Sequence, residues 1–314
     1  MPSLRIRHRT LYRYARPVGF AQHRLLVRPR DSHDLRLNDA TLMVTPAPAA
    51  TRWAHDVFGN SICLLDWTPE TRAEELEIVS ELDLTHFPAG AGLPGATLDP
   101  SAEIYPFSYA AEEAPDVGRF RDRHLPDPQR VVDAWARRFL RHGGETRTLA
   151  MLAAMTEAVQ AEFTYVAREA EGTNDPVTTL AAGEGTCRDF ALLMMEAARS
   201  LGLAARFVTG YLYDGGNAAT QGGGATHAWC AIYLPGAGWV EYDPTNGLVA
   251  GDNLVRVGVT RTPEQAVPIS GGFIGEPGDA LGLDVDVTAE PIAAAATEPA
   301  EAQAAVPKKA ALRD

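Results

Sequence analysis

Three residues with the chemistry of covalent acyl transfer occur in order along the chain: a thiol, an imidazole and a carboxylate. Cys187 opens an apolar run within residues 183–191, directly after two glycines and a threonine. His227 follows forty residues later, and Asp243 follows sixteen residues after that. A thiol beside a base, with a carboxylate to orient that base, can attack a carbonyl group and form a thioester.

Cys187 is expected at the first position of a helix. Thr186 is a favoured N-cap residue, and Asp189 can complete a capping box three positions later. The unpaired N–H groups at such a helix start favour a thiolate and can also bind an oxyanion. Gly185 has no side chain where a substrate backbone would approach, so it is assigned to substrate binding together with Trp229. Taken alone, the segment is equally compatible with a buried structural cysteine.

His227 begins a predicted strand over residues 227–234. Strand alternation points His227 and Trp229 to one face and Cys230 to the other, among apolar neighbours. Cys230 is therefore interpreted as a core residue and not as the nucleophile. The same separation argues against zinc binding by His227 and Cys230, because metal ligands must converge on one point.

The orientation of Asp243 depends on a hairpin between the strand over 227–234 and a second strand over 238–243. A three-residue loop, residues 235–237, gives a register in which Trp229 faces Asp243 and the imidazole lies diagonally across from the carboxylate. A four-residue loop would turn the carboxylate to the other face. The sequence therefore predicts an odd loop length or a bulge.

Two other carboxylates compete for roles at this site. Glu241 shares a strand face with Asp243 and is the rival partner of His227. A turn carboxylate at the end of a strand is the alternative role for Asp243. Asp189 is expected to form an internal ion pair with Arg206 and to do no chemistry.

The elements that position these residues divide the chain into four parts. Residues 1–87 contain short β-prone runs separated by turn formers, which predicts a β-rich sandwich or half-barrel domain. Residues 88–127 are rich in proline and glycine and are interpreted as a linker or an irregular wrap between domains. Residues 128–284 form the predicted core, and residues 285–314, rich in Ala, Glu and Pro, are predicted to be a disordered tail. Within the core the pattern predicts helices over 131–140 and 148–163 and strands over 206–213, 227–234 and 238–243.

Composition limits the classes of partner. The net charge of -13 makes nonspecific nucleic-acid binding a poor interpretation. Residues 1–36 contain nine arginines but only two aspartates. We interpret these arginines as the solvated face of strands. Three cysteines argue against a disulfide framework, and Cys63 is assigned to the core. The first residues do not resemble a signal peptide, and no stretch reaches the roughly 18 apolar residues of a membrane helix. We expect a cytoplasmic protein with no membrane partner.

Four sequence blocks occur in order: Gly185-Thr186-Cys187-Arg188-Asp189-Phe190-Ala191, residues 202–211, His227-Ala228-Trp229, and residues 238–245. Together they resemble the bacterial transglutaminase-like superfamily, a group often described as cysteine proteases. The strand-rich start, with Tyr12-Arg13-Tyr14 and Asp56-x-x-Gly59-Asn60, is similar to the N-terminal region that accompanies this core in bacteria. The resemblance covers about residues 3–275.

The resemblance implies a papain-like α+β core in which helices pack on an antiparallel sheet. It implies that Cys187 is the nucleophile, that His227 acts as base and acid, and that Asp243 orients the imidazole. Animal transglutaminases use an upstream tryptophan to hold the oxyanion, whereas residues 163–165 read Phe-Thr-Tyr here, so that role is unassigned. No cofactor or metal is expected, since no acidic cluster indicates calcium activation.

The preferred hypothesis is a cysteine hydrolase that cleaves a peptide or other amide bond through a thioester on Cys187. The first alternative is a transglutaminase that passes the acyl group to an amine. The second alternative is a non-catalytic binding module with a vestigial site. The expected partner is a peptide, protein or amide-containing substrate, without specific nucleic acid. The sequence leaves the substrate and the oligomeric state open.

Overall fold

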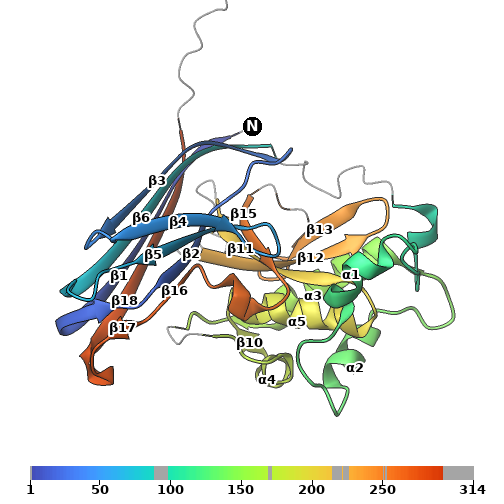
Figure 1. Ribbon diagram of the computed structural model, residues 1–314. Coiled ribbons are helices and arrows are strands. Elements are labelled where there is room, and N and C mark those ends of the chain that lie inside the picture. The colour runs from blue at the N-terminus through green and yellow to red at the C-terminus, as the bar shows by residue number, and fades with distance from the viewer. Residues whose placement is uncertain are drawn as a thin grey trace, which may run out of the picture.

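A strand-only part and a mixed helix–sheet part lie side by side (Figure 1). The computed structural model describes residues 2–87, 98–168, 172–213, 221, 226–249, 251 and 253–292 of the 314-residue chain. The strand-only part contains β1 (Ser3–Phe20), β2 (His23–Arg28), β3 (Leu35–Thr45), β4 (Ala50–His55), β5 (Ser61–Asp66), β6 (Ala73–His86), β16 (Ile269–Ser270), β17 (Phe273–Ile274) and β18 (Ala280–Pro291).

The strand-only part is built from two antiparallel sheets. One has the order β17-β1-β6-β3, with β18 also paired to β1, and the other has the order β16-β2-β5-β4. In β1, Leu4 and Ile6 are fully buried, while Arg5 lies between them on the outer face. The outer arginines pair across the ladder with acidic residues of β6, as in Arg5–Asp83 at 2.6 Å. The predicted strand-rich start and the interpretation of its arginines as an outer strand face are confirmed.

The mixed part contains every α-helix of the described residues. Its elements are η1 (Pro100–Ala102), β7 (Ile104–Tyr105), α1 (Ala114–Arg121), α2 (Val131–Arg137), β8 (Thr146–Arg147), α3 (Thr148–Glu162), β9 (Thr164–Tyr165), α4 (Pro176–Ala182), β10 (Glu184–Gly185), α5 (Cys187–Ser200), β11 (Ala205–Leu212), β12 (Thr226–Leu234), β13 (Gly238–Asp243), β14 (Leu248–Val249), β15 (Leu254–Thr260) and η2 (Pro263–Ala266), and η3 (Pro277–Asp279) precedes β18.

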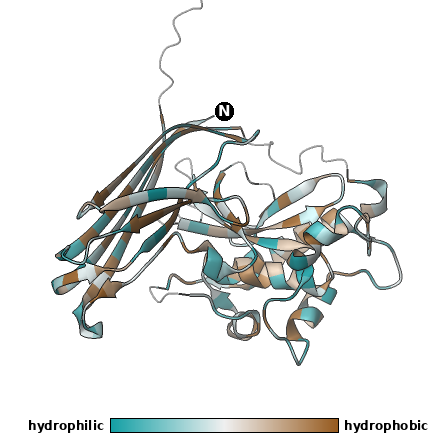
Figure 2. Ribbon diagram, in the orientation of Figure 1, coloured by the Kyte–Doolittle hydropathy of each residue, from teal (hydrophilic) through white to brown (hydrophobic). Residues whose placement is uncertain are grey.

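Helix α5 is the centre of the mixed part. It packs on the antiparallel sheet β14-β13-β12-β11-β15, chiefly against β12. Almost all of its side chains are buried, and Figure 2 shows strongly hydrophobic residues along the helices beneath the sheet. The inward face of β12, from Ala228 to Leu234, joins the same apolar cluster as α5. The predicted α+β class with a papain-like core is therefore confirmed.

The two parts are joined through β11 and β15. Asn60 spans the junction, since its Nδ2 donates to the Val259 carbonyl at 2.8 Å and its Oδ1 accepts from the Val259 N–H at 2.9 Å. Asp56 fixes the Asn60 amide by accepting a second Nδ2 hydrogen bond at 2.9 Å. Tyr211 of β11 and Val255 of β15 belong to an apolar cluster with residues of β1, β2 and β6. The second face of the sheet is thus covered by the strand-only part.

Two predicted domain assignments near the C-terminal end are wrong. Residues 285–291 belong to β18, which pairs with β1 from Leu4 to Tyr14, whereas they were assigned to a disordered tail. The short strands β16 and β17 also join the N-terminal sheets, so residues 269–284 do not belong to the helix–sheet core. Low hydrophobicity misled the prediction, because a strand on an exposed sheet edge needs backbone pairing more than burial.

The proline-rich segment is a wrap around the core and not a free linker. Leu98 and Val117 are buried, and the Tyr105 hydroxyl donates to the Leu201 carbonyl at 2.9 Å. Residues 88–97 lie outside the described residues. Helix α2 ends at Arg137 and not at residue 140, because residues 138–140 form tighter i→i−3 turns.

Candidate active site

Cys187 is the first residue of α5, as predicted. Thr186 is the N-cap, its hydroxyl accepts from the Asp189 N–H, and its own N–H donates to Asp189 Oδ2 at 2.9 Å. This capping box fixes the backbone on which the thiol stands. Cys187 is 7% exposed, so its thiol is largely enclosed but not sealed from solvent. The first N–H groups of α5 have no i→i−4 partner within the helix, and apart from the Asp189 N–H, which the Thr186 hydroxyl accepts, they belong to Cys187 and the residue after it.

Asp189 pairs with Arg168, and the predicted pairing with Arg206 is wrong. The Arg168 guanidinium lies 2.9 Å from Asp189 Oδ2 and 3.1 Å from Oδ1, while the Asn174 N–H donates to Oδ1 at 2.7 Å. Arg206 lies instead against Trp239. The pairing with Arg168 could not be predicted from the sequence. A buried carboxylate can pair with any cation that the fold brings close to it, and the distance along the chain does not show which cation that is.

Gly185 is required by packing next to the capping box. A Cβ there would lie 3.0 Å from Asp189 Cβ and 3.1 Å from Phe190 Cε1. Gly185 is paired with Tyr165 in the short parallel ladder of β9 and β10. Packing alone therefore explains why a glycine occupies position 185. The predicted contact of Gly185 with substrate stays a prediction.

The β12–β13 hairpin has the predicted three-residue loop. Leu234 pairs with Gly238, and Cys230 pairs with Tyr242. This register brings the next residue of β13, Asp243, to the face of β12 that carries the imidazole. The loop-length prediction is therefore confirmed.

His227 and Asp243 are in direct contact. Nε2 of His227 lies 2.9 Å from Asp243 Oδ2, and both side chains are fully buried. Asp243 also accepts from the Thr245 N–H at 3.0 Å and from Asn246 Nδ2 at 2.8 Å. Three hydrogen bonds therefore hold the carboxylate in one orientation toward the ring. Glu241 does not compete, because its carboxylate pairs with another residue, Arg256.

The role of Asn246 is not predicted from the sequence. It follows the Asp-Pro-Thr segment, where an asparagine is an ordinary turn former. Its side chain instead holds Asp243, and the amide also contacts the Gln221 backbone, with the Gln221 N–H donating to Asn246 Oδ1 at 2.9 Å. Asn246 is thus a positioning residue for the carboxylate.

Trp229 supports the imidazole and is not available at the surface. Its ring stacks against His227 with centroids 5.8 Å apart and an interplanar angle of 27°. Trp229 is 0% exposed, which contradicts the predicted contact with substrate. Gly210 makes room for this ring, since a Cβ at that position would lie 2.7 Å from Trp229 Cη2.

The charge state of His227 is set by its two neighbours. Burial lowers its pKa, but the Asp243 carboxylate and the Cys187 thiol outweigh burial and raise the pKa to about 10. Nδ1 is buried and has no hydrogen-bond partner at ordinary distance among the described residues. Since Nε2 is taken by Asp243, Nδ1 is the nitrogen left for Cys187. The neighbouring carboxylate thus favours the protonated, cationic form of the imidazole.

The raised pKa of His227 predicts how folding stability depends on pH. The folded protein holds this proton up to about pH 10, whereas the ordinary histidine value is 6.5. The stabilisation is complete below pH 6.5 and is lost as the pH rises through about 10. Between about pH 6.5 and pH 10, the free energy of unfolding of wild type should fall by up to about 1.4 kcal/mol per pH unit relative to that of His227→Gln. Urea unfolding of both proteins at several pH values measures this, and parallel curves would contradict it.

Tyr165 lies within electrostatic reach of Cys187. Burial raises the pKa of Tyr165, and the charge of Cys187 raises it further. Tyr165 sits on β9 directly across from Gly185. Residues 163–165 have no role predicted from the sequence, because the resemblance implies a tryptophan in this segment. A phenol is also a hydrogen-bond donor, so the tyrosine of this segment could have been proposed as an oxyanion donor from the sequence.

The other thiols are enclosed. Cys230 is fully buried, burial raises its pKa, and its sulfur donates to the Tyr242 carbonyl at 3.7 Å. Cys63 is also fully buried, as predicted for a core residue. Within the described ranges, no group of three or more His, Cys, Asp or Glu side chains is placed to hold a metal ion. Nor does any described helix combine the length and apolar character needed to cross a bilayer.

A thiol at a helix start beside a His–Asp pair on the neighbouring antiparallel sheet defines a papain-like arrangement. Residues 133–244 match the transglutaminase-like superfamily, and residues 4–85 match the bacterial transglutaminase-like N-terminal region. The chain thus carries both regions of the bacterial transglutaminase-like proteins, as the resemblance implied.

Relatives extend over most of the chain. An uncharacterized protein of Mycobacterium tuberculosis is 29% identical over 279 residues, which cover 85% of this chain and 86% of the relative. An uncharacterized protein of Mycobacterium leprae is 34% identical over 106 residues, 33% of this chain and 37% of the relative. The crystal structure of a "putative cysteine protease" from Cytophaga hutchinsonii aligns with a TM-score of 0.65 and 17% identity, covering 93% of this chain and 92% of that one. The last likeness supports the fold alone.

Proposed function

We propose that this protein is a cysteine-dependent acyl-transfer enzyme that hydrolyses a peptide or other amide bond through a thioester on Cys187. The observation that carries the proposal is the buried His227–Asp243 pair at 2.9 Å, with Cys187 acting on the same imidazole. A cationic imidazole held beside a thiol supports a thiolate–imidazolium pair, which is the reactive form of a cysteine nucleophile.

Each residue has one task in the proposed cycle. The Cys187 thiolate attacks the carbonyl carbon, and the negative charge moves to the carbonyl oxygen. His227 gives its proton to the leaving amine, so that the amine departs and a thioester remains. Neutral His227 then takes a proton from water as the water attacks, and the acid product leaves with restoration of the thiolate. Asp243 keeps the ring oriented and stabilises its positive charge throughout.

The oxyanion requires donors close to Cys187. The first N–H groups of α5 supply one set, because they lack partners within the helix and lie at its positive end. The Tyr165 hydroxyl is the second candidate donor, since the charge of Cys187 acts on it across the β9–β10 ladder. A donor placed where negative charge develops lowers the barrier without moving.

Tyr165→Phe should lower kcat by about 10- to 100-fold and leave KM nearly unchanged, because the hydroxyl is needed only when the oxyanion forms. Hydrolysis of a p-nitrophenyl ester measures both constants. Tyr105→Phe is the matched control, since its hydroxyl contacts only the Leu201 carbonyl within the described part of the chain. Equal kinetics of the two variants would remove Tyr165 from the oxyanion site.

The acyl acceptor distinguishes the two enzyme hypotheses. In hydrolysis water resolves the thioester, whereas in transamidation a primary amine does. The decisive experiment follows breakdown of the acyl-enzyme from a p-nitrophenyl ester with and without methylamine. A breakdown rate independent of the amine, with free acid as product, supports the hydrolase. An amide product whose amount rises with the amine concentration would instead establish the transglutaminase alternative.

A non-catalytic binding module is the remaining alternative. It predicts that Cys187 reacts with iodoacetamide no faster than a free thiol does. The enclosed ion pair of His227 and Asp243 weighs against it, because a vestigial site gains nothing from a buried charge that must be balanced. The cytoplasmic location and the absence of nucleic-acid and membrane partners stay predictions.

A further inference from the structure

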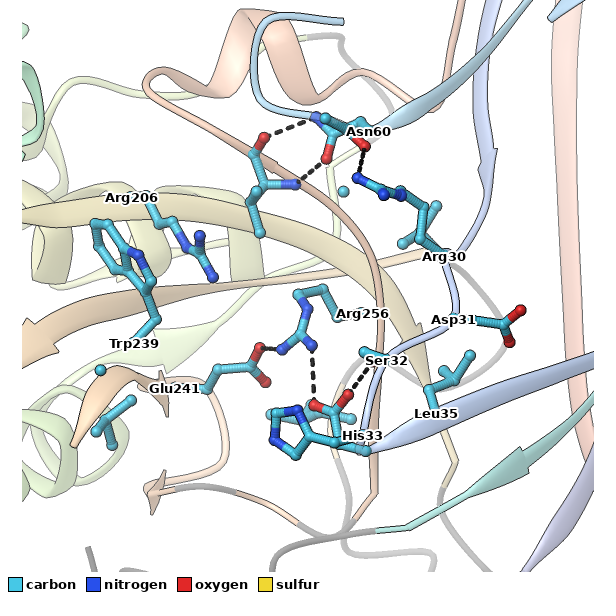
Figure 3. Close-up of a pocket in the computed structure, with 18 of the residues that line it drawn as sticks. Arg30, Asp31, Ser32, His33, Leu35, Asn60, Arg206, Trp239, Glu241 and Arg256 are labelled. Carbon is cyan, nitrogen blue, oxygen red and sulfur yellow. Dashed lines mark hydrogen bonds and ion pairs between the residues drawn. The ribbon is translucent and has the colours of Figure 1, made fainter. Parts of the chain in front are cut away.

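A second site lies between the two parts of the protein. A pocket of about 710 Å³ is walled by β13 and β15 on one side and by N-terminal segments around residues 30–35 and 58–60 on the other. Cys187, His227 and Asp243 do not line it. Its volume lies within the range of small-molecule sites. Figure 3 shows the charged side chains that converge on its interior.

Arg206 is the unusual residue of this pocket. Its guanidinium lies 4.2 Å from the centre of the Trp239 ring, and its Nε is buried without a hydrogen-bond partner. Among the residues described, no hydrogen bond or ion pair engages this side chain. In Figure 3 it points into the pocket with no dashed line to it. Burial, with help from the like charge of Arg256, lowers the pKa of Arg206 to about 10. Arg206 is half-buried, and only its Nε is fully enclosed. A partly buried guanidinium whose nitrogens have no acceptor favours an anion as ligand.

Two carboxylates lie in the same pocket as Arg206. Asp34 and Glu241 both pair with the single guanidinium of Arg256, and the Arg256–Asp34 distance is 2.9 Å. Two carboxylates thus share one cation, and the charges of Arg206, Arg256, Asp34 and Glu241 together sum to zero. The charge of Glu241 favours the protonated form of Arg206, but among the described residues no ion pair joins Arg206 to either carboxylate. The pocket therefore presents separated charges of both signs, a cation without an acceptor on one side and a shared pair of carboxylates on the other. A ligand of either sign alone would satisfy one group and be opposed by the other.

The geometry points to a small zwitterion of the amino-acid type as the ligand of this pocket, with its carboxylate on Arg206 and its ammonium group facing Asp34 and Glu241. A planar guanidinium binds a carboxylate through two parallel hydrogen bonds, whereas a doubly charged phosphate would be repelled by the acidic pair. Trp239, Phe58 and Leu254 line the same space and offer apolar surface to a side chain. An aromatic amino acid combines all three features.

The test compares three probes by isothermal titration calorimetry on the full-length protein. L-phenylalanine carries both charges, L-phenylalaninamide lacks the carboxylate, and N-acetyl-L-phenylalanine lacks the ammonium group. We expect L-phenylalanine to bind with a Kd of about 1 mM or tighter. Each of the other two should bind at least about tenfold more weakly, because each leaves one charged wall of the pocket uncompensated.

Two variants assign the binding to Arg206. Arg206→Met keeps apolar contact with Trp239 and should weaken L-phenylalanine binding by about tenfold or more. Arg206→Lys keeps the charge without the fork and should weaken binding less, which preserves the test if the methionine variant is unfolded. Arg30→Met is the control, because Arg30 also lines the pocket but donates to the Gly59 carbonyl at 2.7 Å.

Three outcomes would overturn the inference: no binding of L-phenylalanine to wild type, equal binding of L-phenylalaninamide, or unchanged affinity in both Arg206 variants. The inference is independent of the proposed acyl transfer. Cys187→Ala should bind L-phenylalanine with wild-type affinity, since Cys187 does not line the pocket. Loss of acyl transfer and loss of this binding are therefore separate results.

Discussion

Cys187→Ala should abolish the thioester and lower acyl transfer by about 10,000-fold or more. The reason is that the covalent intermediate can form only on this sulfur, and the other two cysteines are fully buried. Intact-protein mass spectrometry after reaction with a p-nitrophenyl ester measures the adduct, and release of nitrophenol measures the rate. Wild type should gain one acyl group, and the variant none.

Cys230→Ala is the matched control for this experiment. Its sulfur faces the Tyr242 carbonyl on the α5 side of β12, where it packs in the core. The variant should keep the acyl adduct and most of the rate while losing some stability, because a small buried side chain is truncated. An adduct that persists in Cys187→Ala and disappears in Cys230→Ala would reverse the assignment of the nucleophile.

Asp243→Asn should lower kcat by about 100- to 10,000-fold with the fold intact. The amide keeps the size of the side chain but removes the charge that raises the pKa of His227, so less imidazolium is present at neutral pH. Steady-state kinetics over a range of pH measure both effects. The alkaline limb of the rate profile should move toward lower pH in the variant.

Glu241→Gln distinguishes the two carboxylates of β13. Glu241 pairs with Arg256 and not with His227, so its loss should change the rate by less than about threefold and leave the pH profile in place. A larger loss in Glu241→Gln than in Asp243→Asn would mean that the wrong carboxylate has been assigned to the imidazole.

The features of this site that depend on neighbouring residues could be predicted from the sequence. The capping box at Thr186 and Asp189 and the three-residue loop of the β12–β13 hairpin both depend on near neighbours, and both are observed as predicted. Strand alternation then separates Cys230 from His227, because side chains alternate without exception along a regular strand. These features explain why the order Cys, His, Asp could be converted into geometry.

Pairings between residues far apart in the chain could not be predicted from the sequence, for physical reasons. The partner of Asp189 is Arg168, which lies 21 residues earlier in the chain and outside any helix or strand. Strand β18 gains its order from pairing with β1, some 270 residues earlier in the chain, and its own composition gives little sign of this. Trp229 was read as a substrate contact, although a large aromatic side chain next to a buried ring is more often packing.

Alkylation of native Cys187 by iodoacetamide tests the central claim most directly, since it needs no knowledge of the substrate. If Cys187 is held as a thiolate beside the His227 imidazolium, its second-order rate constant at neutral pH should exceed that of a free thiol. His227→Gln should remove this advantage. The site of modification is read by peptide mass spectrometry. A rate at or below that of a free thiol, equal in wild type and His227→Gln, would contradict the account.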